Sequence, residues 1–479
     1  MSSISTNYIF NAALTVSSYA INLILFPYVT RVLGAEGIGQ AGYVSECVNY
    51  FAVFSVLGIA TVGTREIAAC GQDLEKRSIV FSSLVSILMG TTGIVLFLYL
   101  CACFVVPRFI QDQNLFLLGS SVLVSMSFLM EWFYQGIERF KYITIRTLAI
   151  KMLYVVAVFI LVRSKEDVIV YFSLTALMSV LNALVNILTT RRLVHFSFSL
   201  AKPFLYIRPV LILGAYGIMV SMYTYFTSVY LGFVASDDQV GYFYASKKLM
   251  YLILGFFSAF AAVMFPRISN LLADEQKEEI DKKISQSFDV VLSTSLPIVV
   301  FCEVFAGDII RILSGPDFTG AVLPMRIIMP VLFFSAMAQI WVMQVLFPMR
   351  KDGIILLSSF LGAISGIVLS ICLIRPLGAI GAACVFLISE LAGNLYSFVY
   401  AVRRHLFTFP IRLVINRLLV AIPYLVICML VLSLCNGMWM RLVVAAIASG
   451  IWFLVYYFGV EPHSLIAMQV KRVLSRFRS

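Results

Sequence analysis

Long apolar runs, separated by short polar connections, follow one another along the whole chain. The runs lie at residues 8–33, 40–63, 78–103, 115–137, 148–163, 168–190, 210–235, 240–265, 288–306, 321–347, 353–374, 380–402, 418–435 and 439–459. A membrane-spanning helix needs about 20 apolar residues, so this pattern predicts an all-α polytopic membrane protein with about 14 transmembrane helices. Connections such as residues 164–167 and 236–239 are very short, which makes the helices that flank them antiparallel neighbours.

The basic residues are divided unevenly between the two alternating sets of connections. When residues near the ends of runs are counted with the adjoining connections, 25 of the 35 Lys and Arg lie in the set that includes both termini, seven lie in the opposite set, and three lie in the interior of runs. Cytoplasmic connections of membrane proteins are enriched in Lys and Arg. The asymmetry therefore predicts that both termini are cytoplasmic.

Composition narrows the class of protein further. Hydrophobic residues make up 61% of the 479 positions and charged residues only 12%, whereas soluble domains carry about 25% charged residues. A soluble domain is thus excluded, and 39 Phe with 23 Tyr exclude a disordered chain. The net charge of +11 reflects the cytoplasmic connections and predicts membrane lipids, not nucleic acid, as partners.

No arrangement of residues in the sequence predicts catalysis. The nine Cys are scattered without disulfide or metal spacing, and the three His are far apart. No phosphate-binding loop is present. We therefore expect no catalytic residue, no metal site and no cofactor.

Two predicted cytoplasmic connections have the spacing of amphipathic helices. They lie at residues 268–289 and 405–418, and the second carries Arg412 and Arg417. Both segments are expected to lie along the membrane surface, with these two arginines available to anionic headgroups.

A weak internal repeat relates the two halves of the chain. Matching Gly39 to Gly241 sets an offset of 202 residues, which also places Arg65 on Arg267. Each half then contains six spans with the same orientation, and parallel repeats of this kind enclose a cavity along the membrane normal. The predicted divisions are a six-helix lobe at residues 1–200, a second at residues 201–402, and, at residues 403–479, an amphipathic connector, two added helices and a basic cytoplasmic tail.

Several segments of the sequence carry a family resemblance. They are TRVLGAEGIGQAGYVSECVNYF (30–51), TVGTREIA (61–68), VGYFYASKKL (240–249) and MFPRIS (264–269). Together with two six-span lobes and an added helix pair, they resemble polysaccharide exporters of the Wzx type, the O-antigen flippases. These exporters belong to the multidrug/oligosaccharidyl-lipid/polysaccharide superfamily.

The resemblance implies a flippase of the bacterial plasma (inner) membrane that is not an enzyme. Its cargo would be undecaprenyl-diphosphate-linked oligosaccharide, moved to the outer leaflet by alternating access for O-antigen or other surface polysaccharide. A polysaccharide polymerase and a chain-length regulator are the implied protein partners, and membrane potential, H⁺ or Na⁺ are the implied sources of coupling. A cation-coupled multidrug antiporter and a membrane glycan polymerase or ligase are the alternatives.

Charged residues inside the predicted spans are the candidate functional residues, because a charge in the bilayer is costly and normally faces a cavity or a partner. Lys247, Lys248 and Arg326 would form a cationic site for the anionic cargo, with Glu46 beside it from the other lobe. For the two lysines, the alternative is snorkelling to the outer boundary.

Four further residues have weaker patterns. Glu131 and Glu390 are candidates for cavity or coupling roles, although Glu131 could lie at the membrane interface and Glu390 could pair with Asn394. Arg65 and Arg267, at the cytoplasmic ends of matching spans, could make the first contacts with the diphosphate or could simply set orientation. The glycines near residues 34–42 predict a tight turn and close helix contact.

Overall fold

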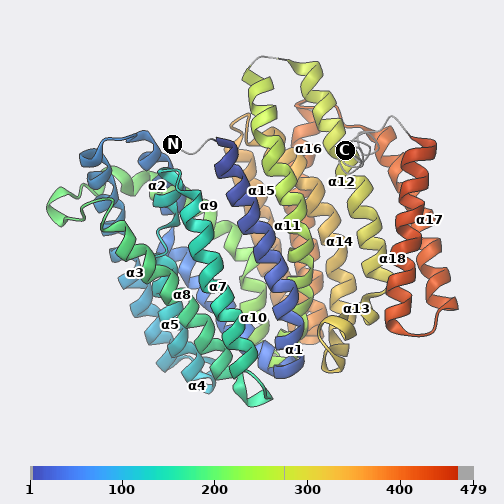
Figure 1. Ribbon diagram of the computed structural model, residues 1–479, viewed down its shortest axis with the longest axis horizontal. Coiled ribbons are helices and arrows are strands. Elements are labelled where there is room, and N and C mark those ends of the chain that lie inside the picture. The colour runs from blue at the N-terminus through green and yellow to red at the C-terminus, as the bar shows by residue number, and fades with distance from the viewer. Residues whose placement is uncertain (1–3, 274–275, 462–479) are drawn as a thin grey trace. The chain divides into compact units, whose positions relative to one another are not determined.

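The computed structural model describes residues 4–273 and 276–461, and these residues form helices joined by turns, with no strand among them (Figure 1). The helices are α1 (Ile4–Val56), α2 (Ile59–Ala69), α3 (Leu74–Val105), α4 (Pro107–Gln111), α5 (Gln113–Ser127), α6 (Glu131–Gly136), α7 (Phe140–Leu161), α8 (Val168–Thr190), α9 (Phe204–Thr224), α10 (Phe226–Val234), α11 (Asp237–Ala273), α12 (Lys277–Val304), α13 (Ala306–Leu313), α14 (Val322–Gln339), α15 (Asp352–Leu377), α16 (Ala379–Arg403), α17 (Ile411–Leu434) and α18 (Met438–Val455). Short 3₁₀ segments η1 (Lys165–Asp167), η2 (Phe198–Leu200) and η3 (Pro316–Ala321) and π-helical turns η4 (Ile340–Leu346) and η5 (Tyr456–Val460) complete the described chain. The all-α fold class is confirmed.

Among the described residues, 13 helices are long and apolar enough to cross a membrane. The first of them contains two of the predicted spans, because α1 is broken at Gly34, whose φ of 71° and ψ of −178° are not helical. A left-handed φ is readily adopted by glycine and is costly for other residues. The 13 helices therefore correspond to about 14 predicted spans, because the first helix accounts for two of them. The location of the termini stays a prediction.

Gly39 and Gly241, the two glycines that set the repeat offset, each lie very close to the backbone of the segment that contains the other. A Cβ added to Gly39 would lie 1.9 Å from the Asp237 carbonyl oxygen, and a Cβ added to Gly241 would lie 2.1 Å from the Ala35 carbonyl oxygen. Asp237 follows Ala35 by 202 residues, as Gly241 follows Gly39. Gly39 approaches Asp237, and the counterparts of these two residues in the other half of the repeat, Gly241 and Ala35, also approach each other. Such a reciprocal pair of contacts is what a two-fold axis produces. The close helix contact predicted for the glycines near residues 34–42 is therefore present at Gly39.

We expect Gly39→Ala to destabilise the protein, because the new methyl group must displace backbone and not a flexible side chain. Overpacking of this kind costs about 1–3 kcal/mol, so the melting temperature of the purified protein should fall by about 1–3 °C. The matched control is Gly90→Ala in α3, where an added Cβ has nothing within 4 Å. A Gly39→Ala protein as stable as the control would contradict the tight contact.

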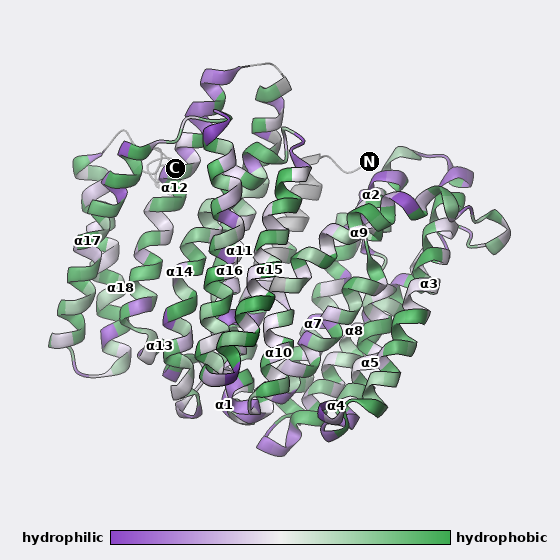
Figure 2. Cartoon of the chain, turned by 180° about the vertical axis from the view of Figure 1, so that it is seen from behind, coloured by the Kyte–Doolittle hydropathy of each residue, from purple (hydrophilic) through white to green (hydrophobic). Residues whose placement is uncertain are grey.

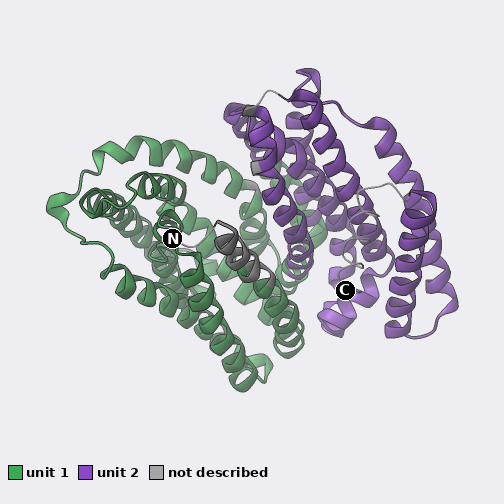
Figure 3. Ribbon diagram, turned by 45° about the horizontal axis from the view of Figure 1, so that its top comes forward, with its two compact units in different colours: residues 1–244, 366–382 green, residues 245–365, 383–479 purple. Residues whose placement is uncertain are grey.

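The chain divides into two compact units, which Figure 3 shows in different colours. Unit 1 contains residues 1–244 and 366–382, and unit 2 contains residues 245–365 and 383–479. In unit 1, Phe81, Trp132 and Phe133 lie in a buried cluster that joins α2, α3 and α6. In unit 2, Phe305 and Cys428 belong to a cluster that joins the end of α12 to α17 and α18. The predicted lobes, residues 1–200 and 201–402, stay a prediction.

The polar segment at residues 268–289 does not form a separate surface helix in the described part of the chain. α11 continues to Ala273 and α12 begins at Lys277, so most of the segment lengthens these two helices, and the tip of α12 carries the hydrophilic colour in Figure 2. Residues 405–410 are not helical, and α17 begins at Ile411. The interpretation as two amphipathic surface helices was wrong, because helical hydrogen bonding continues past the apolar part of each span.

Candidate functional site

The fourth predicted span is interrupted in unit 1. α5 ends at Ser127 and α6 begins at Glu131, and Met130 between them has a left-handed φ of 50°. Asn186 of α8 donates its side-chain N–H to the Leu129 carbonyl oxygen in the break. Irregular backbone at membrane depth is tolerated where protein groups satisfy it. The Asn186 amide performs that role here.

A buried arginine joins this break to α7. Arg146 donates one guanidinium N–H to the Asn186 carboxamide oxygen and another to Glu131 Oε1 at 3.1 Å. Its side chain is only 4% exposed, whereas that of Glu131 is 40% exposed. The Arg146 guanidinium also lies 5.8 Å from the centre of the Tyr142 ring. Glu131 is therefore an ion-pair partner that keeps one side accessible. Arg146 is one of the 25 basic residues that the charge count places in cytoplasmic connections, but it lies inside α7.

A second ion-pair cluster in unit 1 ties α4 to the start of α11. Arg108 pairs with Asp112 at 3.1 Å and with Asp237, and its Nε donates to the Gly232 carbonyl oxygen at 3.0 Å. All three charged side chains are at most 16% exposed. Arg108 also lies 5.1 Å from the centre of the Tyr43 ring. Arg108 is one of the seven basic residues in the opposite set of connections, and no sequence pattern predicts this cluster.

The candidate cationic residues lie in unit 2. Lys247 of α11 is 5% exposed and Lys248 is half-buried, so Lys247 is covered by protein. Arg326 of α14 is exposed, and its Nε donates to the Glu303 carbonyl oxygen of α12 at 3.2 Å. Glu303 carries a buried Oε1 atom without a hydrogen-bond partner, and the sequence analysis did not single it out. The cationic site formed by the three residues stays a prediction.

Of the candidate carboxylates, Glu390 has a defined polar environment in unit 2. Ser335 Oγ donates to Glu390 Oε1 at 2.6 Å, and Asn394 Nδ2 donates to the same oxygen at 3.2 Å. The predicted pairing with Asn394 is therefore present, and Ser335 joins α16 to α14. Glu46 of α1, in unit 1, is 6% exposed and thus covered by protein.

The two predicted first contacts for a diphosphate are both exposed. Arg65 of α2 donates to Glu66 Oε1 from Nε at 3.1 Å and from Nη2 at 2.9 Å, so its charge is already neutralised. Arg267 lies on α11 in unit 2. Their role in substrate contact stays a prediction.

Unit 2 contains a buried arginine that the sequence analysis placed at the membrane surface. Arg417 is 3% exposed along its side chain and pairs with Asp289 at 2.7 Å and with Glu461 at 2.5 Å. It also donates to Tyr456 Oη at 3.1 Å and lies 5.3 Å from the centre of the Tyr457 ring. The prediction that Arg417 is available to lipid headgroups was wrong, because α17 brings it onto α12 and not into the interface.

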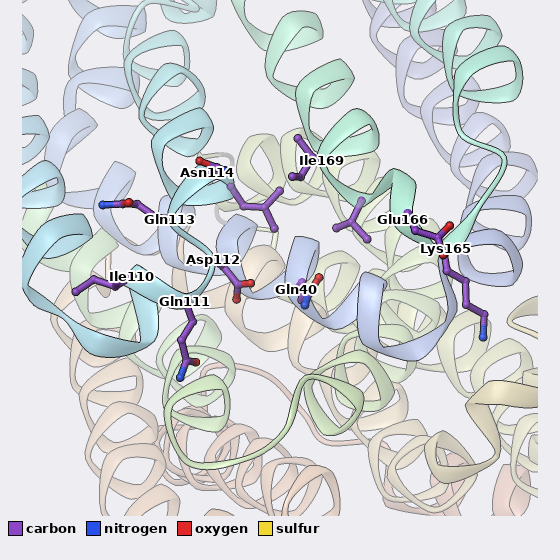
Figure 4. Close-up of a pocket in the computed structure, with 11 residues that line it drawn as sticks. Gln40, Ile110, Gln111, Asp112, Gln113, Asn114, Lys165, Glu166 and Ile169 are labelled. Carbon is purple, nitrogen blue, oxygen red and sulfur yellow. The ribbon is translucent and has the colours of Figure 1, made fainter.

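A polar pocket of about 440 Å³ lies in unit 1 between α1, α5 and α8. In Figure 4, Gln40 and Asp112 lie near its centre, whereas Gln113 and Lys165 point outward from it. Asp112 is already engaged by Arg108. No group of His, Cys, Asp and Glu suited to a metal ion occurs among the described residues.

Comparisons with known proteins agree with this architecture. The sequence model of the family described as polysaccharide biosynthesis protein matches residues 4–272. A protein of Escherichia coli (strain K12) named "Putative O-antigen transporter" is 25% identical over 403 residues, which cover 81% of this chain and 94% of that protein.

Two solved structures share the fold. The lipid II flippase MurJ, in an inward closed conformation, has a TM-score of 0.75 at 15% identity and covers 94% of this chain and 99% of its own. A multidrug resistance MATE family transporter of the MOP superfamily, in an inward-facing conformation, has a TM-score of 0.62 at 14% identity. The match covers 80% of this chain and 93% of that transporter.

Proposed function

Because the chain belongs to the polysaccharide biosynthesis protein family, we propose that it is a flippase for lipid-linked oligosaccharide in the bacterial inner membrane. The proposed cargo is the undecaprenyl-diphosphate-linked repeat unit of O-antigen or another surface polysaccharide. The protein would carry it from the cytoplasmic to the outer leaflet by alternating access, with no bond made or broken.

The observation that carries the proposal is the match to the Escherichia coli relative, which extends over 81% of this chain and is not confined to one motif. The fold shared with a lipid II flippase agrees with it. The physical support is the pair of charged side chains that protein covers within the predicted spans, Glu46 and Lys247. Such residues are expensive in a bilayer and mark substrate or ion pathways.

The lobes at residues 1–200 and 201–402 are proposed as the two halves whose movement gives alternating access. Residues 403–479 are proposed as a C-terminal appendage that is not part of either half. Lys247, Lys248 and Arg326 are proposed to bind the diphosphate, with Glu46 keeping the cations paired when no cargo is present. Glu131 and Glu390 are proposed coupling carboxylates. The polymerase and the chain-length regulator remain proposed partners.

The proposal is tested by deleting the gene in its own bacterium. Loss of a flippase should leave undecaprenyl-linked repeat units accumulated in the cytoplasmic leaflet and remove the surface polymer, and the intact gene should restore both. Sensitivity to toxic cations with unchanged surface glycan would instead identify a multidrug antiporter, for which the shared MATE fold is the supporting observation. Repeat units that reach the outer leaflet but stay unpolymerised would identify a polymerase or ligase.

We expect membrane potential to assist transport. A diphosphate carries about two negative charges, and its outward movement at an inside-negative potential releases about 2.3 kcal/mol per charge per 100 mV. The rate of flipping in proteoliposomes should therefore fall when an imposed potassium diffusion potential is collapsed with the H⁺ and Na⁺ gradients held constant. An unchanged rate would assign coupling to an ion and not to the potential.

A further inference from the structure

The segment between α8 and α9 in unit 1 exposes large aromatic side chains. We refer to residues 191–203 as the α8–α9 connector. Phe196 and Phe198 of the connector are exposed, the second at 64%, and their ring centres are 4.9 Å apart. Phe204, the first residue of α9, is 87% exposed. Exposed apolar side chains that gather in one place indicate contact with a partner or with lipid.

The connector has a defined conformation because α3 holds its backbone. Three of its N–H groups donate hydrogen bonds to buried serine hydroxyl groups of α3. The bonds run from His195 to Ser78 at 3.2 Å, from Ser197 to Ser82 at 3.1 Å and from Lys202 to Ser83 at 2.7 Å. Val194 of the connector is buried in the cluster that contains Phe81. The exposure of the phenylalanines is therefore part of the fold and not the result of a loose loop.

The exposed aromatic surface continues along one face of α9. Four large apolar residues of this helix are exposed at helical spacing, namely Phe204, Leu205, Leu211 and Ile212. The helix is long and apolar enough to cross a membrane, and an exposed apolar face on such a helix belongs in lipid. The connector directly precedes this face, so its phenylalanines are placed at the boundary of the bilayer. This continuity favours lipid over a soluble protein as the partner.

The connector is also positively charged. Arg191, Arg192 and Lys202 are exposed, and the sequence has no Asp or Glu between residues 168 and 236. These cations belong to a connection that the charge asymmetry predicts to be cytoplasmic. The cytoplasmic leaflet has a negative surface potential, because it contains anionic lipids, and it attracts basic segments at its surface. The charge of the connector therefore complements an anionic headgroup.

We propose that the α8–α9 connector is a docking surface for anionic phospholipid of the cytoplasmic leaflet. Its exposed phenylalanines enter the boundary between headgroups and acyl chains, and its exposed cations bind the phosphate groups of the lipid. Interfacial segments combine large apolar side chains with Lys and Arg in this way. The inference goes beyond the proposed function, since it concerns a structural lipid and not the cargo.

The test places a fluorescent reporter in the connector of the full chain. Phe198→Trp is suitable, because this side chain is 64% exposed and its backbone N–H is not one of those bonded to α3. The protein is reconstituted in phosphatidylcholine nanodiscs that contain a minor fraction of brominated lipid, which quenches nearby tryptophan. The signal of the unmodified chain, which has four Trp, is subtracted. We expect brominated phosphatidylglycerol to quench the reporter at least about threefold more than brominated phosphatidylcholine at equal fraction.

The main variant adds Arg191→Gln/Arg192→Gln to the reporter protein. We expect the excess quenching by phosphatidylglycerol to fall at least about twofold, while quenching by phosphatidylcholine persists because the aromatic side chains still enter the bilayer. The matched control is Arg403→Gln/Arg404→Gln, which removes two adjacent exposed arginines at the end of α16, also predicted to be cytoplasmic. The control should retain the full excess. An equal loss in the control would overturn the proposal, since surface charge in general would then explain it.

A charge-preserving variant separates binding from damage to the fold. Arg191→Lys/Arg192→Lys should keep the excess quenching, whereas its loss there would show that the arginines act through structure and would contradict the proposal. No quenching by either lipid would also overturn it and would assign the exposed phenylalanines to a protein partner. Equal quenching by the two lipids would show an apolar contact without recognition of anionic headgroups, which is again a negative result.

Discussion

Replacing Arg417 with Met should destabilise unit 2 by about 3–5 kcal/mol, which is the usual cost of removing one partner of a buried ion pair. The variant would leave Asp289, with a side chain 13% exposed, and Glu461, 27% exposed, without their shared cation. Both the melting temperature and the protection of α17 from hydrogen exchange should fall. The effect is expected to concentrate on α17 because Arg417 is the residue through which that helix bonds to Asp289 on α12.

The control for this variant lies on the same helix. Arg412→Met removes an exposed arginine of α17 and should leave stability within about 0.5 kcal/mol of the unmodified protein. Adding Asp289→Asn to Arg417→Met should recover part of the loss, because the double variant no longer buries an unpaired carboxylate at that position. An Arg417→Met protein as stable as the Arg412→Met protein would show that the cluster contributes nothing to docking of α17.

The helices of this protein were predictable because lipid imposes a simple rule on the sequence. Each span must hold about 20 apolar residues, and the runs so found correspond to the described helices. The close contact at Gly39 was also accessible, because the glycines near residues 34–42 predict close helix contact. The contact at Gly241 was not predicted. Gly34 shows a limit of this kind of prediction. The apolar pattern is nearly the same for one helix that is broken at a glycine and for two separate helices.

The buried ion pairs were not predictable for a different physical reason. Arg146 and Arg417 lie six residues after the starts of α7 and α17, where the sequence pattern reads as polar connection before the apolar run begins. Helices extend past the lipid, so an arginine near a boundary can be buried by protein. Its partners are distant in sequence: Asn186 is 40 residues from Arg146, and Asp289 is 128 residues from Arg417. Only the tertiary arrangement places these groups together.

Burial changes the interpretation of the candidate lysines. A snorkelling lysine keeps its ammonium group in water and leaves its residue largely accessible, but Lys247 is 5% exposed. A buried ammonium group needs compensation by an opposite charge or by a ligand. The observed burial argues against snorkelling for Lys247. Its place in a cationic site stays a prediction, and half-buried Lys248 is compatible with either role.

We expect Lys247→Gln/Lys248→Gln to abolish glycan export at normal membrane levels of the protein. Two charge-assisted contacts with the diphosphate would be lost, at about 1.5–3 kcal/mol each, while Gln keeps similar length and polarity. Surface polymer and accumulated lipid-linked repeat units, measured in a deletion strain that carries the variant, report the effect. Lys→Arg at either position should retain much of the export, because the charge is kept.

The matched control for the lysine pair is Lys282→Gln/Lys283→Gln in α12. It removes two adjacent lysines from the same unit, and Lys282 is 63% exposed along its side chain and pairs with Glu279. This variant should export normally, because neither position is a predicted in-span charge. Full export by Lys247→Gln/Lys248→Gln would show that these cations do not hold the cargo. Loss of export in both pairs would assign the effect to net charge, since both variants remove two positive charges from the same unit.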